Sequence, residues 1–178
     1  MTRPHAAMWM LEVAGGAAGV VVGAAREIVS HAPHRIQVLE PGGERRLLYV
    51  RAESGLEEAF RALEAGALRS VRIDFDGGEM DWLLLFTPHF DGDPSPWWSL
   101  VAQQQGSADP LRAFRTASRR PGLRFAALTA DESLDDLPAR VDAGSFPWDH
   151  PDLVVAAVWD DTGAVTARLG PYLLPSRT

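Results

Sequence analysis

Four carboxylates lie within one short stretch of the sequence, DFDGGEMDW at residues 74–82: Asp74, Asp76, Glu79 and Asp81. Two glycines separate them, and no basic residue interrupts the run. Carboxylates at this density can coordinate a divalent cation, pair with arginines of the same chain, or present a negative surface to a cationic partner. The element that carries them decides which of these three kinds of chemistry is available.

The net charge of the chain is concentrated in the segment around this stretch. Residues 73–111 hold seven acidic residues and no arginine, while the other 17 acidic residues match the 17 arginines. The formal net charge of −7 therefore belongs to this segment alone, which favours a cationic partner over nucleic acid. Two further acids and two tryptophans extend the region: Asp91, Asp93, Trp97 and Trp98.

The alternation of apolar and polar residues over 70–86 predicts a β-hairpin beneath the carboxylates, and Gly77-Gly78 suit a two-residue turn. That register places the carboxylates on one face in two opposed pairs, Asp76 with Glu79 and Asp74 with Asp81. The alternate residues form the predicted core face: Ile73, Phe75, Met80 and Trp82. Each opposed like-charge pair costs about 0.2–1 kcal/mol, so we expect a counter-charge to meet them.

Three sources of that counter-charge follow from the sequence. A basic protein partner is the first, and a divalent cation held together with Asp91 and Asp93 is the second. The third is a stripe of arginines at positions i, i+3 and i+7 of a predicted helix over 109–120: Arg112, Arg115 and Arg119. The prolines in DGDPSPWW fall where an EF-hand loop needs ligands, so we expect no metal site.

The helices and strands that the sequence pattern predicts around these residues indicate an α+β fold. Antiparallel β-hairpins form a sheet packed against two or three helices, in a single domain spanning 1–178. Strands are predicted at 7–13 and 123–130, hairpins at 35–50, 70–86 and 152–170, and helices at 20–32, 54–68, 95–105 and 109–120. In the first hairpin, a turn at Gly42-Gly43 would set Val38 opposite Leu47 and Ile36 opposite Tyr49.

A glycine-rich segment, LEVAGGAAG at 11–19, lies between a predicted strand and a predicted helix, and the next strand ends in Glu40. It resembles the first motif of S-adenosylmethionine-dependent methyltransferases. The resemblance implies that Glu12, Gly16 and Glu40 contact the cofactor, within a Rossmann-like α/β fold as the alternative architecture. Ala14 stands where that family has its first glycine, and a predicted hairpin follows Glu40 where the family has a helix.

The composition of the chain excludes several kinds of site and of protein. The chain has no cysteine, which excludes disulfides, thiolate metal sites and a cysteine nucleophile. All 17 basic residues are arginine and asparagine is absent, a bias typical of GC-rich bacterial genomes. The uncharged stretch Val13–Ala25 is too short to cross a bilayer, so we expect a cytoplasmic protein that does not enter the membrane.

These patterns favour binding over catalysis. The expected partner-binding surface gathers the acidic hairpin and the loop after it: Asp74, Asp76, Glu79, Asp81, Asp91, Asp93, Trp97 and Trp98. Such a surface suits capture of a basic protein, as by an immunity or inhibitor protein that blocks a basic toxin, and needs no cofactor. In layout, the segment 44–86 is similar to small immunity proteins of bacterial toxin systems. The alternative is a small methyltransferase-like enzyme that uses the segment 11–19.

Overall fold

Nine strands of the described part of the chain form one antiparallel sheet in a computed structural model of the protein. The structure describes residues 7–13, 18–29, 32–43, 45–48, 53–77, 80–88, 98–104, 122–129, 144–149, 151, 153–160 and 162–169. The sheet order is β3-β2-β4-β5-β6-β1-β7-β8-β9. In chain order the strands are β1 (Ala7–Val13), β2 (Arg35–Leu39), β3 (Arg45–Leu48), β4 (Ser70–Asp74), β5 (Met80–Phe86), β6 (Trp98–Gln104), β7 (Leu123–Thr129), β8 (Leu153–Trp159) and β9 (Val165–Leu169).

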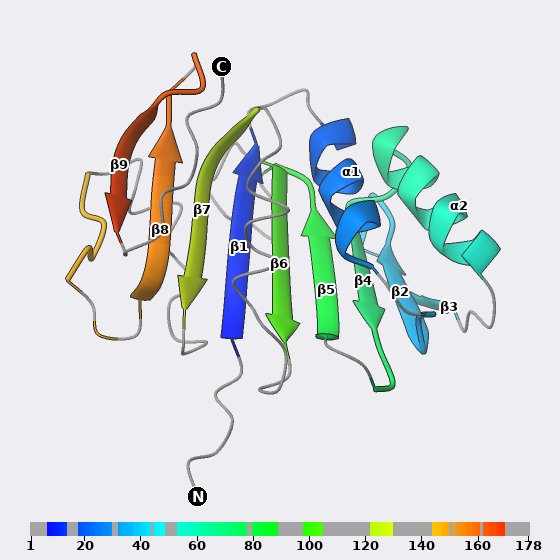
Figure 1. Cartoon of the computed structure of the whole chain (residues 1–178). Helices are drawn as coiled ribbons and strands as arrows, with labels where there is room; N and C mark the ends of the chain where they lie inside the picture. The colour runs from blue at the N-terminus through cyan, green and yellow to red at the C-terminus, as the bar shows by residue number, and fades with distance from the viewer. Residues whose placement is uncertain are drawn as a thin grey trace, which may run out of the picture.

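Two helices, α1 (Ala18–Ile28) and α2 (Glu53–Glu64), lie side by side on one face of this sheet (Figure 1). We call this the helix face and the opposite side the second face. Alternate strand residues reach the helix face and are fully buried there, among them Ile73, Leu83 and Leu100. The main core therefore lies between the helices and the sheet, as the α+β prediction requires, and that prediction is confirmed.

The third predicted hairpin is confirmed as β8 and β9. Its turn is held by Asp160, whose carboxylate accepts hydrogen bonds from the backbone N–H groups of Thr162 (2.9 Å) and Ala164 (3.0 Å). Gly163 has a φ of 81°, a conformation that glycine adopts without steric cost. The sequence DDTG therefore contains both the side chain that caps the turn and the residue that allows it.

The helix predicted over 95–105 is wrong, because residues 98–104 form the strand β6. This strand pairs with β5 on one side and with β1 on the other, near the middle of the sheet. Leu100 and Ala102 belong to the main core, whereas Val101 belongs to a second apolar cluster. Because consecutive residues 100–102 are apolar and serve two different clusters, the period of two is hidden in the sequence.

The hairpin formed by β2 and β3 is confirmed, but its register is shifted by one residue from the prediction. Val38 pairs with Arg46 and Ile36 with Leu48. The connection is longer than a two-residue turn, because the outermost pair joins Leu39 to Arg45. A hydrogen bond from the Gly43 N–H to the Glu40 carbonyl (3.1 Å) closes a turn within it.

The Rossmann-like alternative is wrong. A dinucleotide-type site needs two adjacent parallel strands joined by a helix. Here β1 pairs in antiparallel fashion with both of its neighbours, β6 and β7. The strand that follows α1 is β2, and β4, β5 and β6 lie between β2 and β1 in the sheet. The segment 11–19 therefore lacks the βαβ unit that the methyltransferase resemblance implies.

The helices α1 and α2 are joined by an ion pair that involves Glu57. Ser54 and Glu57 have capping-box spacing, yet the helix already includes Glu53, so Ser54 is inside it. Glu57 instead accepts hydrogen bonds from Arg26 of α1, at 2.9 Å from Nε and 3.1 Å from Nη2. A weaker contact of 3.4 Å joins Arg26 to Glu64. The interaction is tertiary and therefore invisible to local spacing.

Because of the ion pair between Arg26 and Glu57, we expect part of the free energy of unfolding to depend on pH. The hydrogen bond from Arg26 lowers the pKa of Glu57 below its usual value of 4.5. A lowered pKa in the folded state contributes stability that is present above about pH 4.5 and is lost as the pH falls through the folded pKa. Because both side chains are partly exposed, we expect only about 0.3–1 kcal/mol.

Urea unfolding at pH 7 and pH 3 measures this contribution. The Glu57→Gln variant should lose less stability than the native protein between the two pH values. Glu58→Gln, which changes an exposed carboxylate one residue further along α2, is the matched control and should behave like the native protein. Identical pH dependence in the Glu57→Gln variant and the native protein would refute the assignment.

Candidate functional site

The acidic hairpin formed by β4 and β5 has a register one residue away from the predicted one. Asp74 pairs with Trp82 and Ile73 with Leu83. The ladder continues one step beyond the strands, where the Phe75 N–H donates to the carbonyl of Asp81 (2.9 Å). The chain therefore reverses over residues 76–80, with Gly77 at a φ of 84°. The predicted opposition of Asp74 to Asp81 is wrong.

The shift of one residue moves Trp82 to the other face of the sheet, because side chains alternate along a strand. Trp82 was predicted to lie beside Ile73 in the core, but it lies on the second face and packs against a second apolar cluster. Met80 is buried as predicted and belongs to the main core. An irregularity in the pairing of β5 with β6 between Met80 and Trp82 accommodates this change of face.

Two arginines of the sheet supply the counter-charge of Asp74. Arg35 is the direct partner of Asp74 on β2. Its Nε donates to Oδ2 of Asp74 (2.8 Å), and its Nη2 lies 2.7 Å from the same oxygen. Arg72, two residues earlier on β4, donates from Nε to the other carboxylate oxygen (2.9 Å). The Asp74 side chain is 14% exposed, against 41% and 38% for Arg35 and Arg72. The pairing is therefore partly shielded from water.

Trp82 extends this arrangement across the second face. The guanidinium of Arg72 lies over the Trp82 ring, 4.8 Å from its centroid, as in a cation–π contact. The indole N–H of Trp82 donates to the side-chain oxygen of Gln103 on β6. Pairing across β2, β4, β5 and β6 aligns Arg35, Asp74, Trp82 and Gln103 in one row. We call these four residues and Arg72 the Arg–Trp cluster.

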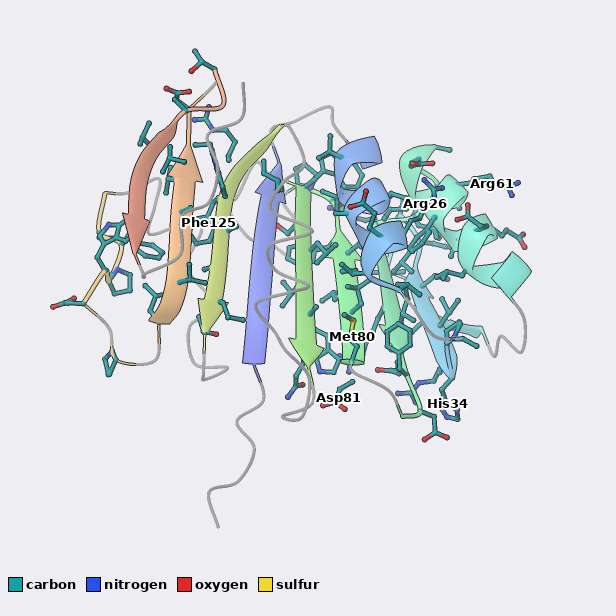
Figure 2. All side chains as sticks on the ribbon, viewed as in Figure 1. Arg26, His34, Arg61, Met80, Asp81 and Phe125 are labelled. Carbon is teal, nitrogen blue, oxygen red and sulfur yellow. The ribbon has the colours of Figure 1, made fainter. Side chains whose placement is uncertain are left out.

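The other acids of the predicted surface lie at or beyond the hairpin turn. Asp76 is exposed and makes no ion pair with any residue in the described ranges. Asp81 is half-buried at the end of β5, at the same end of the sheet as His34 (Figure 2). Glu79, Asp91, Asp93 and Trp97 lie outside the described residues, as do Arg112, Arg115 and Arg119. Of the acids predicted for this surface, the described part of the chain therefore includes Asp74, Asp76 and Asp81.

Trp98 was predicted to belong to the partner-binding surface, but it packs against the main core and is half-buried. It is the first residue of β6 and pairs with Val13 of β1. The strand conformation explains the difference, because the prediction placed Trp98 on a helix that does not form. The described contacts of Trp98 are therefore with the main core, and its role in partner binding stays a prediction.

Glu12 and Glu40, which the methyltransferase resemblance would bring to one cofactor, lie in or next to strands that are far apart in the sheet. Glu12 lies in β1, where it pairs with Ser99 and Phe125, whereas Glu40 follows β2 near the far edge of the sheet. Gly16 lies outside the described residues. Among the described residues, no group of three or more histidine, cysteine or carboxylate side chains could hold a metal ion.

The second face carries apolar packing of its own next to the Arg–Trp cluster. Phe125 of β7, labelled in Figure 2, meets Phe146 edge to face, with centroids 5.5 Å apart. Phe146 in turn contacts Trp148 at 4.4 Å. The segment 144–149 therefore covers part of this face, and Trp82 packs against the same apolar cluster. The Arg–Trp cluster lies at the border of this packing, where it combines polar groups with a half-buried ring.

Three members of this cluster were missed at the sequence level: Arg35, Arg72 and Gln103. Arg72 carried a usable signal, because residues two apart on a strand share a face and Arg72 stands two residues before Asp74. Arg35 and Gln103 carried none, since their proximity depends on which strands are neighbours. Comparison with known proteins adds no further information, because no protein family, curated protein or solved structure matches the chain. Neither of the described helices is long and apolar enough to span a bilayer.

Proposed function

We propose that this protein is a binding module that captures a basic protein partner, in the manner of an immunity or inhibitor protein. The observation that carries the proposal is the exposed carboxylate of Asp76, at the reversal between β4 and β5 and within the segment that holds the whole net charge. A concentrated negative surface accelerates encounter with a cationic partner and repels anionic ones.

The pairing of Asp74 moves the expected contact towards the hairpin turn. Asp74 already has two arginine partners, so its charge is largely compensated within the protein. Asp76 has none among the described residues and costs no internal ion pair when it binds a partner. The basic side chains of the partner are therefore expected to meet the turn, and Asp74 is expected to hold the sheet beneath it in place.

Reversing the charge at the turn tests this function. Two unit charges at 4 Å interact by about 1 kcal/mol in water, so Asp76→Arg, which changes the charge by two units, should weaken binding by at least about tenfold. Calorimetric titration against a purified basic protein encoded by a neighbouring gene measures the effect, and the affinity of the native protein should fall as salt is added.

The control is Asp149→Arg, the same substitution at an exposed aspartate in the segment 144–149. This segment lies beside β8 and β9, whereas the hairpin of β4 and β5 lies between β2 and β6 (Figure 1). Both variants should unfold at the same urea concentration as the native protein, because neither residue makes an ion pair in the described part of the chain. Equal weakening by both variants would argue against a local contact at the hairpin.

A further inference from the structure

Arg72 is held in one orientation, and the described residues use only part of its hydrogen-bonding capacity. Its Nε donates to Asp74, and its guanidinium plane lies over Trp82. Its two terminal nitrogens make no hydrogen bond with the described residues, and the side chain is 38% exposed. A guanidinium carries five N–H donors in a rigid fork, so the outer edge of Arg72 can bind two oxygen atoms of one planar anion.

Apolar residues border this outer edge on the β5 side of Arg72, whereas its partner on β2 is the polar Gln37. Arg72 pairs with Leu84 of β5, and the neighbouring Trp82 and Leu84 are both only half-buried. The orientation of Arg72 is fixed from two sides, by Asp74 and by a ring that Gln103 holds in place. An incoming anion therefore finds an arginine that loses little conformational freedom on binding, next to surface that an apolar group can cover.

The local charge selects the kind of anion. Arg35, Asp74 and Arg72 together carry one net positive charge, which one carboxylate neutralises. A phosphate dianion would exceed that charge, and it would meet the carboxylate of Asp74 and an acidic chain of net charge −7. The site thus matches an aspartate or glutamate side chain with apolar neighbours better than it matches a phosphorylated ligand or a nucleic acid.

From this geometry we infer that Arg72 and Trp82 form a recognition site for a single carboxylate side chain of a protein partner, flanked by apolar residues. The inference rests on the proposed binding function and adds a second, oppositely charged contact to it. Arg72 and Asp76 are four residues apart, about 13 Å along an extended chain. A partner that presents a basic group to Asp76 and a carboxylate to Arg72 can dock in one register only, because reversing it would place like charges together.

Capped tripeptides test the site without any partner protein. Acetyl-Leu-Glu-Leu-amide and its glutamine counterpart are titrated into ¹⁵N-labelled protein, and the Trp82 indole and Arg72 side-chain N–H signals are followed by NMR. The indole signal is assigned from its loss in Trp82→Phe. We expect the glutamate peptide to shift both signals and to bind at least about tenfold more tightly than the glutamine peptide.

Substitution of Arg72 by lysine keeps the charge but removes the planar fork, so affinity for the glutamate peptide should fall at least about fivefold. Arg61→Lys, at an exposed arginine on the outer side of α2 (Figure 2), should leave the affinity unchanged. Trp82→Phe keeps a ring beneath Arg72 and should bind within about threefold of the native protein.

Three results would overturn the inference: equal binding of the two peptides, unchanged binding by the Arg72→Lys variant, or tighter binding of inorganic phosphate than of the glutamate peptide at equal ionic strength. These outcomes are separate from the test of the proposed function. The peptides carry no basic group, so their failure to bind leaves the role of Asp76 intact, and a failure at Asp76 leaves the peptide result intact.

Discussion

Replacing Phe60 by alanine should lower the free energy of unfolding by about 3–5 kcal/mol, the usual cost of emptying a buried aromatic site. Phe60 is fully buried in α2, within the main core between the helices and the sheet. Its ring also lies beneath Arg26 of α1, whose guanidinium is 5.6 Å from the ring centroid. The substitution therefore removes packing to the sheet and a contact between the helices at the same time.

Urea unfolding followed by circular dichroism measures this loss. The matched control is Arg61→Ala, which changes the next residue of the same helix to the same amino acid. Arg61 is exposed, and its replacement should alter stability by no more than about 0.5 kcal/mol. A loss below about 1 kcal/mol for Phe60→Ala would show that α2 does not pack on the sheet as described.

The second large effect is expected in β6, where Ala102→Glu should destabilise the protein by at least about 3–5 kcal/mol. Ala102 is fully buried on the helix face, in a strand that has β5 on one side and β1 on the other. The direct partners of position 102 in the neighbouring strands are Leu83 and Trp9. A carboxylate placed there therefore has no arginine opposite it. We expect low yield of folded protein and an early unfolding transition.

The adjacent substitution Gln103→Glu is the control, because successive strand residues point to opposite faces. Gln103 is half-buried on the second face, where its side-chain oxygen accepts the indole N–H of Trp82. A glutamate oxygen can accept the same hydrogen bond, so the variant should fold with a loss within about 1 kcal/mol. Similar losses from the two substitutions would contradict the strand assignment of this segment.

The register of the acidic hairpin has direct consequences for the binding surface. In the predicted register Asp74 faces Asp81, and all four carboxylates form one repulsive patch. In the observed register Asp74 faces Trp82 and pairs with two arginines, and Asp76 remains exposed at the reversal. The surface that results carries both signs of charge, which gives a partner a more restrictive pattern to match than a uniformly acidic face would.

Local pattern was sufficient for most elements. The strand at 7–13 was predicted with its observed bounds, and the strand predicted at 123–130 is β7. The helix around 54–68 was also found, shorter at its C-terminal end, where Gly66 adopts a φ of 75°. These segments succeed because each shows its own periodicity or its own breaker, so no knowledge of neighbouring strands is needed.

Pattern failed where the decisive contacts come from distant parts of the chain. β6 buries Leu100 and Ala102 on one face and Val101 on the other, and an apolar run as short as this cannot be distinguished from a buried helix by its period. The hairpin registers failed for a related reason. Two adjacent glycines suggest a two-residue turn, but the connections observed are longer, and a slip of one residue exchanges the two faces of a strand.

The sequence by itself determined the α+β class, the acidic segment at 73–111 and the hairpin that carries Asp76, because composition, charge and alternation are properties of neighbouring residues. Only the tertiary structure decided what meets the carboxylate of Asp74. Arg35 reaches it because β2 is the neighbour of β4, and Trp82 stands opposite it because of the register of β5. Strand order and register are set by the packing of many strands against one another and against α1 and α2, which no short stretch of sequence encodes.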